Sequence, residues 1–377
     1  MEKRNGQPAI ATLVKRNSWK LRRIDRYIIR QFLGTYVFSI LLIIAVTVVF
    51  DVNERLDNFL KPEVSLHAIV VDYYLNFIPY FIGIFSPLFT FISVIFFTSK
   101  LADKSEIIAL LAGGVSFNRL LRPYLISAGI IALGSYVLNA YVIPPANETR
   151  IEFQNNYFKN KKVEYARNIQ LEVEPGIFAY FDNYRADSYM GYRFSLDHFE
   201  NKVLVSRLTA ESIKYDSLYQ WTIIDYMIRD FDGMYERITT GSRKDTTLTF
   251  VPSDFLISEN DCETMTSPQL AKHIRRQKER GIGNIQLFEI EYYQRYATVM
   301  SFFILTMIGV SLSSRKIKGG MGLNIGIGIG LSFSYILFSK ISSTFAISGF
   351  VPPMMAVWIP NLIYVLITVY LYLKAPR

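Results

Sequence analysis

Long apolar runs alternate with short polar segments along this chain of 377 residues. A helix needs roughly 20 apolar residues to cross the hydrocarbon core of a bilayer. Six runs reach about this length, and they cover residues 31–50, 68–99, 123–143, 296–313, 321–340 and 353–373. The pattern therefore predicts an integral membrane protein with six transmembrane helices. The second run is longer than a bilayer requires, so we expect 65–77 to form an interfacial helix that bends into the span.

The region between the third and fourth runs has a different pattern. It is polar and rich in aromatic residues, and turn residues separate its short β-prone segments. These segments are 169–173, 177–181, 192–196, 203–208, 212–215, 221–227 and 246–251. Many short strands with turns between them predict a β sandwich or an open barrel, of which a jelly roll is one form. Such a domain either packs only on itself or receives a lipid chain in its apolar interior.

These patterns divide the chain into five parts. A helix that connects the β domain to the fourth span is expected to begin at Ser267 and Pro268, since serine is a good N-cap and proline is tolerated at the first helical position. The predicted fold is an α-helical integral membrane protein with an inserted all-β, jelly-roll-like domain. Its parts are a basic N-terminus (1–30), spans 1–3 (31–143), the β domain (144–266), the connecting helix (267–285) and spans 4–6 (286–377).

The placement of charge predicts the orientation of the spans. The net charge is +9, and nine Lys or Arg residues fall within 1–30. Because this basic segment adjoins a span, the positive-inside rule explains it better than nucleic-acid binding does. The short loops between spans 2 and 3 and between spans 4 and 5 are also basic, and the C-terminus ends in Lys374 and Arg377. We therefore expect both termini in the cytoplasm and the large domain on the outer side.

The cytoplasmic loop at 103–114 is a candidate docking segment. A charged start precedes a short apolar run, and Gly113 and Gly114 end it, which predicts a helix too short to span the membrane. Such a helix either docks in a groove of a partner protein or simply connects two spans. The candidate docking residues are Ser105, Glu106, Ile107, Ile108, Leu110, Leu111 and Gly113.

Small residues recur at four-residue spacing in the fifth span, at Gly322, Gly326, Gly330 and Ser334. They share one helix face, which permits close helix approach. This face either packs within its own bundle or forms a seam that opens against another subunit or a substrate. Three cations near the outer ends of spans are candidates for contact with anionic headgroups, although ordinary loop charge is the plainer interpretation. They are Arg55, Lys61 and Lys340.

The sequence offers no catalytic or metal site. It lacks a G-x-x-x-x-G-K-[ST] phosphate loop, its histidines are far apart, and Cys262 is its single cysteine. We therefore expect neither a bound metal nor a cofactor in this chain. An ion-coupled secondary transporter and a membrane-anchored β-domain scaffold remain the alternatives to a transporter that is driven by a separate ATPase.

Three segments carry a resemblance to a known family. They are Ile24-Asp25-Arg26-Tyr27-Ile28, the loop from Ser105 to Gly114, and Val351-Pro352-Pro353 leading to Pro360-Asn361-Leu362. With the order of three spans, a β domain and three spans, the chain resembles the permeases of the lipopolysaccharide-export ABC transporter, of the LptF/LptG type. The Asp25-Arg26-Tyr27 start favours an LptG-like member.

The resemblance implies an inner-membrane permease without ATPase activity of its own. A paralogous permease would pair with it, and a cytoplasmic ABC ATPase dimer would bind ATP and Mg²⁺ beneath the pair. The loop with Glu106 would be the coupling helix. Lipopolysaccharide would enter sideways between spans 1 and 5, and the periplasmic β domain would pass it to a bridge protein. Family members can carry lysines at the outer end of span 1, whereas 49–57 is acidic apart from Arg55. Arg55, Lys61 and Lys340 are therefore the substitutes we expect.

Overall fold

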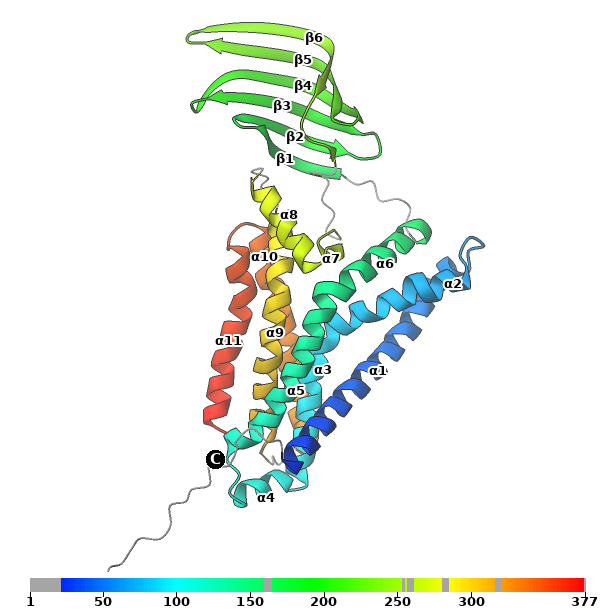
Figure 1. Ribbon diagram of the computed structural model, residues 1–377, viewed down its shortest axis with the longest axis vertical. Helices are drawn as coiled ribbons and strands as arrows, with labels where there is room; N and C mark the ends of the chain where they lie inside the picture. Colours follow the sequence, from blue (N-terminus) through cyan, green and yellow to red (C-terminus); the bar gives the residue numbers. More distant parts are fainter. Residues whose placement is uncertain are drawn as a thin grey trace, which may run out of the picture.

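The computed structural model describes residues 22–158, 165–252, 255, 261–279, 285–315 and 320–375. Within these residues, six helical segments are long and apolar enough to cross a membrane, which confirms the six predicted spans. They form a bundle (Figure 1). Helix α4 lies at one end of this bundle, and a separate β-sheet lies beyond the other end. The helices are α1 (Arg23–Phe59), α2 (Leu66–Ala68), π-helical η1 (Ile69–Tyr74), α3 (Leu75–Asp103), α4 (Glu106–Ala112), α5 (Phe117–Val137), π-helical η2 (Leu138–Val142), α6 (Ile143–Tyr157), α7 (Asp261–Thr264), α8 (Ser267–Glu279), α9 (Gln286–Ser313), α10 (Gly320–Ile347) and α11 (Pro353–Leu373).

Helix α9 lies at the centre of the bundle. It packs against α3, α5, α10 and α11. Packing is tight here, because a Cβ atom at Gly309 would lie 2.8 Å from Cγ1 of Val94. In the most apolar 18-residue window of α9, 61% of the residues are buried, against 11% in α1 and 22% in α10. The first and fifth spans are therefore the least covered helices of the bundle.

The second span bends as its length predicts. Helix α2 and η1 precede α3 without a break, and in Figure 1 they lean away from the bundle together with the upper end of α1. The π-helical stretch is a local insertion in the helical ladder, of the kind that accompanies bends. Pro79 and Pro87 follow inside α3. The predicted interfacial segment 65–77 thus corresponds to α2, η1 and the first turn of α3.

The inserted domain is one six-stranded antiparallel sheet with the strand order β1-β2-β3-β4-β5-β6. This meander confirms an inserted β domain, but it lacks the Greek-key crossings that define a jelly roll. Figure 1 shows the sheet curving over a concave face. The strands are β1 (Tyr165–Glu174), β2 (Ile177–Arg185), β3 (Met190–Glu200), β4 (Val203–Ser217), β5 (Gln220–Asp232) and β6 (Tyr235–Thr247).

Three boundaries differ from those expected. Helix α6 continues to Tyr157, so the strands begin well after residue 144. The segments 203–208 and 212–215 form one strand, β4. The strand expected at 246–251 is instead the end of β6 and the segment after it. Almost all of β6 is exposed, so its polar sequence shows no alternation of apolar and polar residues.

The segment after β6 crosses the sheet and closes its interior. The Oγ1 atom of Thr249 donates a 2.7 Å hydrogen bond to the carbonyl of Val173 on β1, the opposite edge strand. The indole Nε1 of Trp221 donates to the carbonyl of Phe250 at 3.1 Å. Phe250 and Phe255 are buried in the same cluster as Phe181 and Trp221. The core of the β domain is therefore filled by the protein's own aromatic side chains.

Candidate functional site

Helix α4 follows a tight turn at the end of the bundle opposite the sheet (Figure 1). Ser105 precedes it with φ 61°, in the left-handed region, and its side chain does not cap the helix. The amide of Gly113 donates to the carbonyl of Ala109 at 2.9 Å, and Gly114 then adopts φ +83°. Glycine is favoured at such a helix end because it lacks a Cβ atom. The two glycines therefore end α4 as the sequence predicts.

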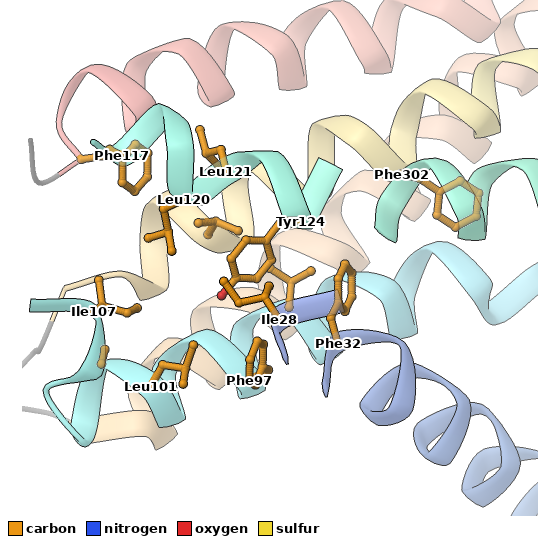
Figure 2. Packing of buried hydrophobic residues seen from close by; sticks show 14 of the residues in the cluster. Ile28, Phe32, Phe97, Leu101, Ile107, Phe117, Leu120, Leu121, Tyr124 and Phe302 are labelled. Carbon is orange, nitrogen blue, oxygen red and sulfur yellow. The ribbon is translucent and has the colours of Figure 1, made fainter. Parts of the chain in front are cut away.

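One face of α4 belongs to the core of the bundle. Ile107 is fully buried, and Leu110 and Leu111 pack against the same apolar cluster. Figure 2 shows Ile107 directed toward Leu120 of α5, with Leu101 of α3 close by. These three side chains, expected to contact a partner, instead fix α4 to its own bundle.

The other face of α4 is available for docking. The side chain of Ile108 is 51% exposed, and Ser105 and Gly113 are also exposed. Glu106 lies half-buried in the first turn. The candidate docking residues thus divide into three that anchor the helix and four that face outward or lie at its edge.

An ion pair next to α4 links the starts of two spans. The Nη2 atom of Arg119, in the first turn of α5, lies 2.5 Å from Oδ2 of Asp25, in the first turn of α1. The backbone amide of Arg22 donates to the same oxygen at 2.7 Å. Ile28 and Phe32 of α1 continue this contact in the apolar cluster of Figure 2. This pair could not be predicted from the sequence, where its visible signal is an acid at position 25 within a basic segment.

A second ion pair fixes the opposite end of α1. The buried carboxylate of Asp51 accepts a 2.7 Å hydrogen bond from Nε of Arg55. The hydroxyls of Tyr73 and Tyr74 donate to its two oxygens at 3.1 Å each. The guanidinium also lies 4.9 Å from the ring centre of Phe158. Arg55, expected to contact headgroups, is therefore held within the protein by Asp51 and by aromatic rings.

The other two candidate cations lie at different places. The Nζ atom of Lys61 donates to the carbonyl of Tyr157 at 2.7 Å, so it joins the end of α1 to the end of α6. Lys340 is exposed on α10. Its charge acts on Glu263 of α7, together with the charges of Arg150 and Arg295. The structure therefore brings Arg55 and Lys61 to the end of α6, at Phe158 and Tyr157, but places Lys340 on another helix, so the three cations do not form one site.

The glycine face of α10 is open. A Cβ atom at Gly322, Gly326 or Gly330 would have no neighbouring atom within 4 Å. At Gly328, by contrast, a Cβ atom would overlap Cδ1 of Ile95 on α3. The glycines at four-residue spacing thus do not serve packing within this chain, whereas Gly328 does. Ser334, expected on the same face, shares a hydrogen bond with the hydroxyl of Tyr364 on α11.

The part of α1 between its two ion pairs is likewise not covered by other helices of the chain. Phe38, Leu41, Val49 and Phe50 are more than half exposed. Gly34 has no neighbouring atom within 4 Å of an added Cβ. Apolar side chains on an uncovered helix need lipid or another protein chain around them.

The described residues also contain no group of three or more His, Cys, Asp or Glu side chains suited to a metal ion.

The bundle of helices able to cross a membrane, two of them with uncovered apolar faces, places the chain in the class of multi-pass membrane proteins. The model of one family, described as lipopolysaccharide export system permease LptF/LptG, matches residues 26–374. The chain belongs to this family, and it is a multi-pass inner-membrane protein of the lipopolysaccharide export system. No curated protein sequence matches the chain.

Proposed function

We propose that this chain is a permease subunit of an ATP-driven transporter. It extracts lipopolysaccharide from the inner membrane and passes it to a periplasmic bridge toward the outer membrane. Both termini and α4 lie in the cytoplasm, and the sheet lies in the periplasm. A paralogous permease completes the membrane part, and a cytoplasmic ABC ATPase dimer binds ATP and Mg²⁺. The observation that carries this proposal is the two-faced α4, anchored by Ile107 and open at Ile108.

The contacts around α4 support a route for mechanical coupling. Leu110 packs against the cluster that contains Leu120, and Arg119 pairs with Asp25 at the start of α1. ATP hydrolysis in the partner moves the groove that holds α4. Because α4 and α5 are packed together, that movement reaches Arg119 and then α1. The first span is thus connected through α5 to the element that the ATPase grips.

The uncovered faces of α1 and α10 support lateral entry of the lipid. Both helices expose apolar side chains along most of their length. The open glycines of α10 permit close approach by a helix of the paralogous permease. Few polar contacts hold the middle of α1, where Tyr36 and Ser86 share a hydrogen bond. A helix that is fixed at its ends and lightly held between them is suited to act as a gate.

The ion-coupled alternative is disfavoured by the partners of the carboxylates in the first span. An ion-coupled transporter needs carboxylates that can bind and release cations within the membrane. Asp25 is paired with Arg119, and Asp51 is paired with Arg55 and accepts from two tyrosine hydroxyls. Both are therefore engaged in structural contacts.

The test is co-purification of the ATPase with the permease pair. We expect Glu106→Arg to abolish ATPase association while the two permeases still purify together, because it places a cation in the docking face. Arg122→Glu is the charge-reversal control, since Arg122 is exposed on α5 and lies outside the candidate docking segment 103–114. A wild-type chain that binds no ATPase in the presence of its paralogue would overturn the proposal. So would an equal loss of ATPase association in both variants.

A further inference from the structure

A cavity of ≈ 440 Å³ opens at the sheet end of the bundle, between α6 and the segment that contains α7 and α8. Its volume falls in the range of small-molecule sites. Glu148 of α6 lines one wall, and Thr264 and Thr266 line the connection between α7 and α8. Lys272 and Arg276, one turn apart on α8, contribute two cations. The cavity therefore has a mixed polar and apolar lining and carries more positive than negative charge.

The charged groups of this cavity differ from their neighbours in having no ionic partner. On the same helix, Nε of Arg275 lies 3.0 Å from Glu279, and Nζ of Lys278 lies 2.5 Å from Glu289. Within the described part of the chain, Lys272, Arg276 and Glu148 form no ion pair. The unpaired charges of α8 are thus those that line the cavity, and the paired charges are those outside it.

The position of the cavity relates it to the membrane surface. The apolar run of the third span ends at residue 143, and Glu148 lies five residues further along the same helical course. At about 1.5 Å per residue, this places Glu148 roughly 8 Å beyond the hydrocarbon. The headgroup layer on each side of a bilayer is about 5–8 Å thick. The cavity therefore opens at the depth where the phosphate groups of lipids lie.

We propose that this cavity binds the phosphate-bearing headgroup of a membrane lipid. Arg276 and Lys272 bind the phosphate through charge-assisted hydrogen bonds, which are the stronger kind. Glu148, on the facing wall, accepts hydrogen bonds from an ammonium or hydroxyl group of the same headgroup. The ligand is thus a lipid that carries both a phosphate and hydrogen-bond donors. The site is separate from the faces of α1 and α10, and it does not depend on the proposed coupling to an ATPase.

The test measures lipid binding to the purified full chain by native mass spectrometry. The probes are dioleoyl phosphatidylethanolamine, dioleoyl phosphatidylcholine and diacylglycerol. We expect K272Q/R276Q to weaken phosphatidylethanolamine binding by about tenfold, the size expected when charged hydrogen bonds are lost. Diacylglycerol, which lacks phosphate, is expected to bind wild type and variant equally.

The matched control is R275Q/K278Q, which removes the same charge from the same helix outside the cavity. We expect it to bind phosphatidylethanolamine as the wild type does. E148Q is expected to weaken phosphatidylethanolamine binding more than phosphatidylcholine binding, because both headgroups lose the attraction of the carboxylate but only phosphatidylethanolamine also loses charged N–H hydrogen bonds. Size-exclusion profiles establish that each variant is folded. The five side chains changed in these variants are all exposed, and Lys278 also pairs with Glu289.

Three outcomes would overturn the proposal. An equal loss of lipid in both double variants would show a general effect of surface charge. Unchanged phosphatidylethanolamine binding in K272Q/R276Q would show that Lys272 and Arg276 do not bind the lipid. Full displacement of the lipid by inorganic phosphate, with the same dependence on Lys272 and Arg276, would assign the cavity to a soluble phosphate instead. A tenfold loss in K272Q/R276Q alone, resistant to inorganic phosphate, supports the lipid headgroup.

Discussion

Arg119 and Asp25 are separated by 94 positions in the sequence, yet their side chains meet at 2.5 Å. The side chain of Asp25 is 5% exposed and that of Arg119 is 22% exposed, so the pair is largely shielded from water. It joins the first turn of α1 to the first turn of the helix that follows α4. The least covered span, α1, is therefore joined by an ionic contact to α5, the helix that directly follows α4.

We expect Arg119→Gln to separate ATP hydrolysis from transport. The ATPase should still bind, because the outward face of α4 is unchanged, but α1 loses its link to α5. Loss of a shielded charged hydrogen bond predicts about a tenfold fall in lipopolysaccharide release from proteoliposomes at unchanged ATPase activity. Arg122→Gln is the control, because Arg122 is exposed on the same helix. Partial recovery in Asp25→Arg/Arg119→Asp would identify the pair, and wild-type transport in Arg119→Gln would exclude it as a link.

Asp51→Ala is expected to release the opposite end of α1. It removes the acceptor of Arg55 and of the Tyr73 and Tyr74 hydroxyls, at a cost of about 2–3 kcal/mol in the free energy of unfolding. Tyr74→Phe removes a single donor and should cost about 1 kcal/mol. Denaturant unfolding of the purified chain measures both. Asp57→Ala serves as the reference, since Asp57 is exposed on the same helix. Equal effects for Asp51 and Asp57 would contradict this assignment.

Two glycines of α10 should respond differently to leucine. Gly328→Leu overpacks the contact with Ile95 and should destabilise the chain by about 1–3 kcal/mol. Gly326→Leu has open space around it, so the isolated chain should keep its stability. It should instead weaken association with the paralogous permease, measured by co-purification. A permease pair that assembles normally with Gly326→Leu would show that this face contacts lipid alone.

Glu263 is expected to make stability depend on pH. Burial raises the pKa of its carboxyl, the charge of Glu291 raises it further, and Arg150, Lys340 and Arg295 act in the opposite direction. The unfolded chain therefore loses this proton at a lower pH than the folded chain does. The protonated carboxyl of Glu263 contributes to stability in acid, and this contribution is lost as the pH rises through the folded-state pKa. Thermal melting of Glu263→Gln should match wild type in acid and exceed it at higher pH. Glu279→Gln, which changes an exposed carboxyl, should show no such pH-dependent difference from wild type.

Local patterns predicted the membrane part well. Six apolar runs became six spans, and the glycines after α4 ended that helix as expected. The ends of the helices were less predictable, because α1 and α6 continue through polar residues beyond the bilayer. Partners such as Asp25 and Arg119 could not be inferred, since no local period connects residues so far apart. Ile107 and Ile108 look equivalent in sequence, and only the packing of α4 on α3 and α5 distinguishes them.

The sheet was the least predictable part. Strand β6 carries Arg237, Thr239, Thr240 and Arg243, and its exposure leaves no apolar face to detect. Its pairing comes from backbone hydrogen bonds to β5 over twelve residue pairs. The concave face was expected to be a simple core or a lipid site. The crossing segment with Phe250 supplies part of that core from outside the strands. The β-strand propensity of the sequence does not predict such a contribution.

The strand order of the sheet also bears on how the chain is made. Each strand pairs only with its neighbours in sequence, so no strand waits for a distant part of the chain. Contacts of short sequence separation form quickly, and domains generally fold as units during synthesis. The sheet can therefore complete itself as soon as residues 165–255 emerge, while α9, α10 and α11 are still to be synthesised. The first three spans and the sheet would then be in place to receive the last three as they insert.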